Sequence, residues 1–255
     1  MSTSGFDLSG RTALVTGAGR SVGEGIAREL AAAGAAVAVN DLHADRAEAV
    51  AASIRDAGGA AVAAPFDVTD AAALDDALAR VTAELGPVDV LVNNAGVPEG
   101  QRTRQFLATD ESDWLLQIQL NLLGSMRVIR AVLPGQVERG WGRVVQISSG
   151  ASSRGLDIGV SAYGAAKSGI EGLVRHVATE VGPSGVTVNA IALGLMENVG
   201  QRNADHLEHL VRDIPVRRLG RPSEIGGTAV WLASEYGGYV TGQVVHVNGG
   251  ALNGR

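Results

Sequence analysis

Tyr163 and Lys167 stand four residues apart in the run Ser-Ala-Tyr-Gly-Ala-Ala-Lys-Ser-Gly at 161–169. If this segment is helical, the two side chains share one face. A tyrosine phenol ordinarily titrates near ~10 and accepts protons poorly at neutral pH, whereas an adjacent cation favours the phenolate. We therefore expect Lys167 to lower the pKa of Tyr163, which makes the pair a candidate general acid/base. A surface tyrosine packed over a lysine stem would show the same spacing, so the pair needs support from the rest of the chain.

A glycine-rich segment, Thr-Gly-Ala-Gly-Arg-Ser-Val-Gly, occupies residues 16–23 after the first apolar run. Glycines at a strand-to-helix turn let the backbone approach a pyrophosphate at the helix N-terminus, although a tight structural turn would also use them. Asp41 follows the second apolar run, where a carboxylate can accept a hydrogen bond from an adenosine ribose and repel a 2′-phosphate. Arg20 could hold such a phosphate, but we give Asp41 more weight. The sequence therefore favours NAD over NADP.

Two alternative sites compete with this interpretation. Gly19, Ser21 and Gly23 satisfy the G-x-S-x-G pattern of a hydrolase nucleophile elbow, with His246 available downstream. That reading leaves Asp41 and the Tyr–Lys pair without a role, so it remains a remote alternative. A second candidate, the pair His206 and His209 with its acidic neighbours, is typical of a solvated helix face, and we predict no metal.

Short apolar runs alternate with segments of helical periodicity along the whole chain. The runs are apolar at nearly every position, as in parallel strands covered on both faces. This alternation predicts a single domain over residues 1–255, with an α/β, doubly wound (Rossmann), mostly parallel seven-stranded sheet and helices on both faces. Gly34 and Gly58 mark helix ends, and a long helix is expected to end near Pro134. The expected strands are 12–16, 36–40, 61–66, 88–92, 143–148, 186–191 and 243–247.

The composition narrows the class of protein. Of the 255 residues 45% are hydrophobic and 19% are charged, which indicates a globular chain. The net charge of −6, without a basic run, argues against nucleic-acid binding. No cysteine is present, which excludes disulfides and zinc–thiolate sites. The N-terminal residues lack a signal-peptide layout, and no apolar run approaches the ~18 residues of a membrane helix, so we expect a cytoplasmic protein away from membranes.

Several motifs in chain order resemble the short-chain dehydrogenase/reductase family along essentially the whole sequence. The glycine-rich segment is similar to its T-G-x-x-x-G-x-G turn, and Tyr163 with Lys167 fits its Y-x-x-x-K motif. The other matches are Asp67-Val68, Asn93-Asn94-Ala95-Gly96, Asn121, Ser149 at the end of Gly-Arg-Val-Val-Gln-Ile-Ser-Ser, and the tail 239–250.

The resemblance implies an NAD(H)-dependent oxidoreductase that interconverts a secondary alcohol and a ketone. In its catalytic set Tyr163 transfers the proton, Ser149 orients the substrate oxygen, Lys167 also anchors the nicotinamide ribose, and Asn121 supports a water beside the lysine. The resemblance also implies a homotetramer packed through the long helices around Asn121 and Tyr163. It leaves open the substrate, which could be a β-hydroxyacyl thioester, a steroid, a sugar or a cyclic alcohol. An NAD-binding regulatory or scaffold protein on the same fold is the alternative. The implied cofactor contacts are Gly17, Arg20, Ser21, Val22, Asp41, Leu42, Asp67, Val68, Asn94, Ala95, Gly96, Tyr163, Lys167, Gly194, Met196 and Asn198.

The sequence departs from the family pattern at three places. Ser21 replaces a glycine and is expected to shift the pyrophosphate turn slightly. Leu193-Gly194 replaces Pro-Gly after the sixth strand, and Asn198 aligns with a threonine that meets the nicotinamide amide in many members. Residues 195–213 are polar and charged, with few apolar anchors, and are expected to form a substrate lid.

Overall fold

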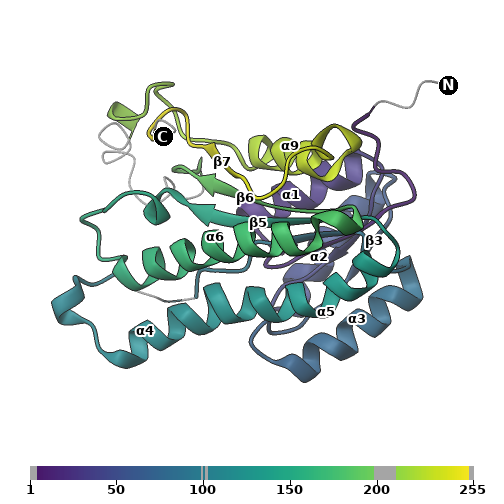
Figure 1. Cartoon of the computed structure of the whole chain (residues 1–255), viewed down its shortest axis with the longest axis horizontal. Helices are drawn as coiled ribbons and strands as arrows, with labels where there is room; N and C mark the ends of the chain where they lie inside the picture. The colour runs from purple at the N-terminus through teal and green to yellow at the C-terminus, as the bar shows by residue number, and fades with distance from the viewer. Residues whose placement is uncertain (1–4, 99, 101–102, 198–210, 253–255) are drawn as a thin grey trace.

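The computed structural model describes residues 5–98, 100, 103–197 and 211–252, and its centre is one seven-stranded sheet (Figure 1). All neighbouring strands are parallel, in the order β3-β2-β1-β4-β5-β6-β7. The predicted doubly wound fold is confirmed. The strands are β1 (Thr12–Val15), β2 (Ala36–Val39), β3 (Ala61–Ala63), β4 (Val90–Asn93), β5 (Gly142–Ser149), β6 (Val186–Leu193) and β7 (Val244–Val247).

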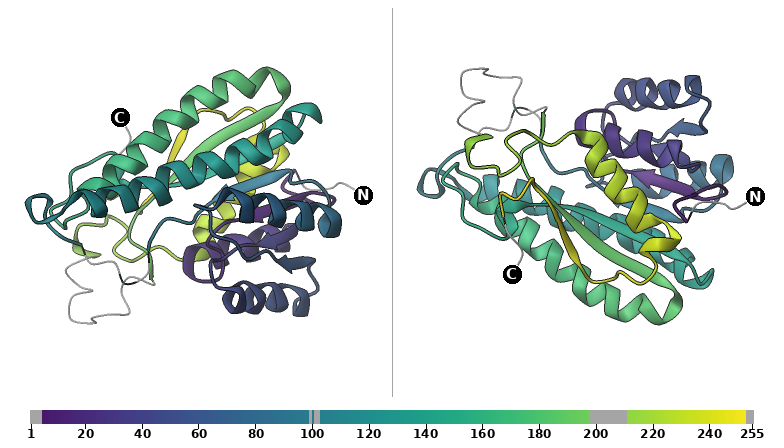
Figure 2. Two further views of the ribbon diagram at one scale, coloured as in Figure 1. Left: turned by 90° about the horizontal axis from the view of Figure 1, so that it is seen from below. Right: turned by 90° about the horizontal axis from the view of Figure 1, so that it is seen from above.

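Helices cover both faces of the sheet, as Figure 2 shows from two sides. One core cluster joins the sheet to α1, α2 and α9, and the other joins it to α3, α5 and α6. A π-helical stretch, η2 (Gln119–Gly124), connects α4 to α5. The helices are α1 (Ser21–Ala32), α2 (Ala44–Asp56), α3 (Ala71–Leu85), α4 (Glu111–Ile118), α5 (Ser125–Glu138), α6 (Ser161–Val181) and α9 (Pro222–Ala233).

Alternation along the strands explains the two cores. Successive side chains of a strand point to opposite faces, so Ala13 and Val15 of β1 join the α1–α2–α9 core while Leu14 joins the other. All three side chains are fully buried. A strand buried on both faces favours apolar residues at most positions, which is why the strands were visible as mostly apolar runs. β5 and β6 also contain buried polar residues, among them Arg143, Gln146 and Asn189.

The helix ends also follow local rules. Gly34 and Gly58 adopt φ values of 99° and 86° just after α1 and α2 end, a conformation that glycine takes without steric cost. Asp70 caps α3 by accepting hydrogen bonds from the backbone N–H groups of Ala72 and Ala73. Because the strands are parallel, the segments that leave their carboxyl ends meet at one edge of the sheet.

The predicted helix end at Pro134 is wrong, since α5 continues to Glu138. Proline removes one helical hydrogen bond, to the carbonyl four residues earlier. Here Pro134 and Arg130 are both exposed, so water can satisfy that carbonyl. The buried side chain of Gln136 then anchors the last turn by donating to the backbone oxygen of Asp89 at 2.8 Å.

Two strand lengths also differ from expectation. β3 ends at Ala63 rather than at residue 66, because Asn40 Nδ2 donates to the carbonyls of Ala64 and Phe66 and takes the place of a strand ladder. β6 runs on to Leu193, which pairs with both Ser149 and Val247. Most of the expected lid, 198–210, lies outside the described residues. Within the described part of the chain, no helix is long and apolar enough to cross a membrane.

Candidate active site

Tyr163 and Lys167 lie in the first turns of α6 and share one face, as the spacing predicted. The ammonium of Lys167 is 5.5 Å from the centroid of the Tyr163 ring. Lys167 is only 2% exposed, and its Nζ donates to the backbone oxygen of Ile147 on β5 at 2.8 Å. Helix and strand therefore fix the lysine together.

The electrostatics of this pair differ from the prediction. Burial raises the pKa of Tyr163, because the phenolate loses its water, and a hydrogen bond with the Ser149 side chain lowers it in part. The expectation of a Tyr163 pKa lowered by Lys167 is thus wrong for this structure. Burial lowers the pKa of Lys167 to about 8, and the negative charge of Glu171 raises it in part. At neutral pH the phenol keeps its proton and Lys167 remains a cation.

Ser149 meets Tyr163 from the carboxyl end of β5. It is the last residue of the strand and precedes a 3₁₀ turn, η3 (Gly150–Ser152). Its Oγ accepts a hydrogen bond from the N–H of Ala151 at 3.2 Å, which orients the hydroxyl. The predicted serine and tyrosine are therefore brought together, although 14 positions separate them in the sequence.

Asn121 lies in η2 and is fully buried. Its Nδ2 donates to Oε1 of Gln117 at 2.9 Å. An added Cβ on Gly96 would stand 2.6 Å from Asn121 Oδ1 and 3.1 Å from Lys167 Nζ, so the three predicted residues converge on one point. Among the described residues Asn121 Oδ1 has no hydrogen-bond partner, which leaves an acceptor facing the lysine. Asn121 thus lies in a π-helical turn, an irregularity that interrupts the helical run between α4 and α5.

The glycine-rich turn packs against the end of β4. Asn94 Nδ2 donates to the carbonyls of Thr16 and Gly17, at 3.0 and 2.9 Å. In return Thr16 Oγ1 accepts from the N–H groups of Asn94 and Ala95. Gly17 has φ 61°, and a Cβ there would lie 2.9 Å from the Cα of Ala95. These contacts require glycine at position 17 and give Asn94 a structural role beside the predicted cofactor contact.

Ser21 has a backbone conformation that glycine adopts without steric cost. Its φ is 59°, in the left-handed region, and α1 begins at this residue. A non-glycine residue there costs on the order of 1–3 kcal/mol. The chain thus holds a strained serine in the turn, and the expected shift of the turn stays a prediction. Arg20 is exposed, whereas the side chain of Val22 is part of the core, so Val22 offers only its backbone to a ligand.

Asp41 is buried at the carboxyl end of β2, beside the glycine-rich turn. Its Oδ2 accepts from the N–H of Gly19 at 3.1 Å, and its Oδ1 accepts from the N–H of His43 at 3.0 Å. The carboxylate thus borders the turn where the sequence placed it, and it also shapes that turn. The neighbouring Leu42 is 62% exposed, as a residue lining an adenosine site could be.

The other predicted contacts lie at the same edge or outside the described residues. Asp67 accepts hydrogen bonds from the N–H and the hydroxyl of Thr69, both at 2.8 Å. Val68 is buried, and its side chain stands 3.1 Å from a Cβ placed on Gly124. Gly194 donates to the Val247 carbonyl, and Met196 is buried and forms a bridge with Gly220. The predicted contact Asn198 lies outside the described residues, as do His206 and His209, which were considered as a metal pair.

The sequence interpretation missed four polar residues that support the site. Thr16 and Asn40 fix the glycine-rich turn, since Asn40 Oδ1 also accepts from the N–H of Gly17 at 3.2 Å. Gln117 orients Asn121, and Glu171 acts on Lys167. A signal existed for two of them: Asn40 is polar at the end of an apolar run, and Glu171 extends the four-residue spacing of Tyr163 and Lys167.

Comparison with known proteins places these observations in a family. A family model described as Enoyl-(Acyl carrier protein) reductase matches residues 17–251. The chain is 40% identical to Nodulation protein G of Azospirillum brasilense, over 95% of this chain and 98% of that protein. It is 35% identical to the 3-oxoacyl-[acyl-carrier-protein] reductase of Escherichia coli (strain K12), over 96% and 98%. The crystal structure of a gluconate 5-dehydrogenase from Burkholderia cenocepacia J2315, in complex with NADP and tartrate, superimposes with a TM-score of 0.90 at 34% identity, covering 98% of each chain.

The alignments cover nearly the full length of each relative, and the superimposed crystal structure has the same fold as this chain. The hydrolase alternative at Ser21 is not supported, because these matches are named as a reductase and a dehydrogenase. The chain belongs to the short-chain dehydrogenase/reductase family and is an oxidoreductase.

Proposed function

We propose that this protein interconverts a secondary alcohol and a ketone with NAD(H). The observation that carries the proposal is the buried constellation at the carboxyl edge of the sheet. Tyr163 is hydrogen-bonded to Ser149, and Lys167 lies beneath the same face of α6 next to Asn121. A general acid/base, an orienting hydroxyl and a fixed cation are the protein groups that such a reaction requires.

In this mechanism the protein handles the proton, and a bound nicotinamide supplies or accepts the hydride. The Tyr163 phenol is protonated at neutral pH, since burial raises its pKa above the ordinary value, so it carries the proton that a ketone oxygen would receive. In the reverse direction Tyr163 takes the hydroxyl proton. Ser149 holds the substrate oxygen beside the phenol, and the Lys167 cation stabilises negative charge on the phenolate.

The residues present fit a dinucleotide. The left-handed Gly17 allows close approach of the backbone, and α1 begins at the same turn, which suits a pyrophosphate. We infer NAD rather than NADP from Asp41, because a buried carboxylate at the turn would repel a 2′-phosphate. The gluconate 5-dehydrogenase that resembles this chain was crystallised with NADP, so the choice of nucleotide needs a direct measurement.

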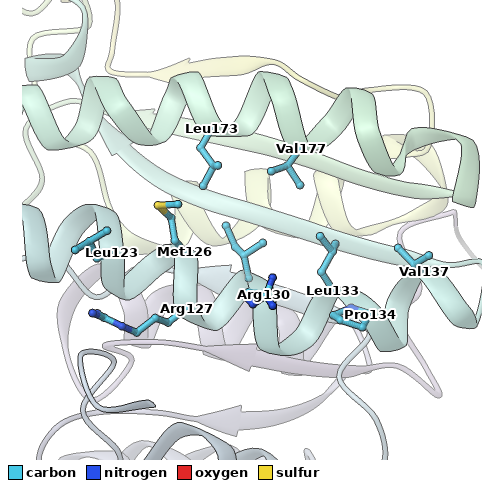
Figure 3. A pocket seen from close by; sticks show the side chains of 10 residues that line it. Leu123, Met126, Arg127, Arg130, Leu133, Pro134, Val137, Leu173 and Val177 are labelled. Atoms are coloured by element: carbon cyan, nitrogen blue, oxygen red, sulfur yellow. The ribbon is translucent and has the colours of Figure 1, made fainter.

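We further propose a homotetramer in which the α5–α6 pair forms one of the subunit interfaces. Figure 3 shows a groove between these helices in which apolar side chains of both point toward each other. Met126 is 38% exposed there and Val137 is 36% exposed. A second copy of the same helix pair would bury this strip, as in isologous interfaces. The groove is lined by Leu123, Met126, Arg127, Ile129, Arg130, Leu133, Pro134, Val137, Leu173 and Val177.

An activity screen tests the enzymatic proposal. The purified protein is mixed with a panel of alcohols and ketones, among them sugar acids, steroids, β-hydroxyacyl thioesters and cyclic alcohols, in the presence of each nucleotide. We expect a change in nucleotide absorbance with at least one compound. Tyr163→Phe should abolish it without weakening nucleotide binding, because only the transferable proton is lost. Nucleotide binding without turnover on any compound would favour a scaffold protein.

The cytoplasmic location of the protein stays a prediction.

A further inference from the structure

Glu171 is a buried carboxylate that the reaction scheme above does not use. It lies on α6 one turn beyond Lys167 and is 8% exposed. Its Oε1 stands 2.5 Å from the hydroxyl of Ser148 and 2.5 Å from the hydroxyl of Ser152, both of which can donate to it. A buried charge is costly unless it is hydrogen-bonded, so packing alone would favour an apolar residue here.

Both partners of Glu171 flank the catalytic serine. Ser148 precedes Ser149 on β5, and the Ser152 hydroxyl also lies 2.6 Å from the backbone oxygen of Ser149. Because a hydroxyl carries one hydrogen, Ser152 donates to one of its two acceptors at a time. Glu171 thus contacts the side chains of residues on either side of Ser149 in the sequence.

Further contacts bind the same turn to α6. Ser168 Oγ lies 3.0 Å from the carbonyl of Ser152 and 2.8 Å from that of Gly164, and can donate to one of them at a time. An added Cβ on Gly164 would stand 2.8 Å from the carbonyl of Ala151, so the turn lies directly against the helix. The turn that follows Ser149 thus contacts α6 at three successive levels: Gly164, Ser168 and Glu171.

We propose that Glu171 is a positioning residue, which locks the turn carrying Ser149 onto the helix carrying Tyr163 and Lys167 and holds Lys167 in its cationic form. The catalytic part of this inference rests on the proposed function. Its structural and electrostatic part does not, because the two hydroxyl contacts and the position of the carboxylate one turn from Lys167 exist without a reaction.

The groups around Lys167 support the second role proposed for Glu171, which is to keep the lysine in its cationic form. On its own helix the titratable neighbours are Tyr163 and Glu171, and Glu171 is the charged group that acts on the ammonium. From β5 the Ile147 carbonyl faces Nζ, and from η2 the Asn121 amide oxygen, both neutral acceptors. Within the described part of the chain Glu171 therefore supplies the negative charge that offsets the burial of Lys167.

The sequence allows this to be measured at a single atom. Lys167 is the one lysine in the 255 residues, so protein labelled with lysine carrying carbon-13 at Cε has one lysine Cε signal. Its titration midpoint in the wild type is expected near the Lys167 pKa of about 8. In Glu171→Gln, which keeps the size and one acceptor, the midpoint should move to lower pH because the stabilising anion is gone. Glu180→Gln, at an exposed position of the same helix, should leave it unchanged.

Turnover gives the second readout. Glu171→Gln should lower kcat by about tenfold, since small displacements of a catalytic group have effects of that size or larger. Its nucleotide affinity should remain that of the wild type, and the alkaline limb of its pH profile should move in the same direction as the Lys167 midpoint. The double variant Ser152→Ala/Glu171→Gln should lose less activity than the sum of the losses in the single variants Ser152→Ala and Glu171→Gln, because both residues act through one contact.

An unchanged Lys167 midpoint in Glu171→Gln, or strictly additive losses in the double variant, would overturn the inference. A wild type without turnover on any compound would overturn the proposed function instead, and the labelled lysine would still decide whether Glu171 holds the ammonium.

Discussion

Gln117 accepts a hydrogen bond from Asn121 Nδ2, which turns Asn121 Oδ1 toward Gly96 and Lys167. Both amides are buried, and neither Gln117 Nε2 nor Asn121 Oδ1 has a partner within the described chain. Gln117 thereby selects one of the two orientations of the Asn121 amide. The buried end of α4 thus sets which atom of Asn121 faces Lys167.

Gln117→Leu should lower kcat about tenfold while leaving stability within about 1 kcal/mol of the wild type. The loss of rate follows from the free rotation of the Asn121 amide. The small stability change is a balance, because an unpaired buried N–H₂ group is removed while Asn121 Nδ2 loses its acceptor. Steady-state kinetics and urea unfolding measure the two quantities. A variant with full activity would show that Asn121 needs no side-chain support.

Gly96→Ala should inactivate the enzyme without unfolding it. The added methyl would stand 2.6 Å from Asn121 Oδ1, so Asn121 or Lys167 must move away from the site. Gly227→Ala is the matched control, because a Cβ there meets nothing within 4 Å and the residue lies within the helix α9. Circular dichroism and turnover of both variants give the result, and an active Gly96→Ala would contradict the close packing around Asn121.

Lys167 should make activity and stability respond to pH in opposite directions. Its pKa is about 8 in the folded protein and 10.5 ordinarily. Below both values the lysine is protonated in both states. Between them the folded state has released its proton and the unfolded state has not, so the free energy of unfolding should rise with pH by up to roughly 3 kcal/mol from this group.

The Lys167 cation is lost over the same interval, so turnover should fall. In Lys167→Met the rise in stability should disappear, and the variant should be inactive yet at least as stable as the wild type at about pH 7, since no charge is buried. Urea unfolding at about pH 7 and about pH 9.5 measures this. A wild type and a variant with parallel pH dependence would contradict it.

Asp41→Asn should narrow the preference for NAD over NADP, because it removes the charge that repels a 2′-phosphate. Asparagine retains one acceptor oxygen, so one of the two backbone N–H groups, on Gly19 or His43, keeps its partner. The ratio of kcat/KM for the two nucleotides is the measurement. Equal use of both nucleotides by the wild type would mean that Asp41 shapes the turn without selecting the nucleotide.

Met126→Glu should disrupt the proposed tetramer, since it places a charge in the apolar groove between α5 and α6. Ala83→Glu adds the same charge at an exposed position of α3 and should leave the assembly intact. Analytical ultracentrifugation gives the mass of each species. A wild type that sediments as a monomer would refute the assembly itself.

The sequence predicted the framework well because the framework follows from periodicity. Continuous apolar runs locate all seven strands, and the residues that follow parallel strands must meet at one edge. That rule and the family resemblance together indicated that Gly96, Asn121 and Lys167 belong to one site. The end of α5 could not be predicted from Pro134, because what carries the helix onward is the tertiary contact of Gln136 with Asp89.

The direction of the Tyr163 pKa shift was beyond the sequence for a related reason. The four-residue spacing shows that a cation is near, but it does not show how far burial opposes the cation. Likewise, the role proposed for Glu171 depends on its hydrogen bonds with Ser148 and Ser152, which lie 23 and 19 positions away in the sequence. Sequence spacing shows which groups lie near one another. Burial and long-range partners, which determine the protonation and hydrogen bonding of those groups, are properties of the folded chain.

The burial of Lys167 has a practical consequence for the chemical handling of this protein. Because this side chain carries the one lysine amine of the chain and is 2% exposed, amine-directed reagents should react with the folded protein mainly at its α-amino group. Coupling to an activated ester surface would then hold every molecule by the same point, with the catalytic amine spared. Loss of that selectivity on heating would report the opening of the active site directly.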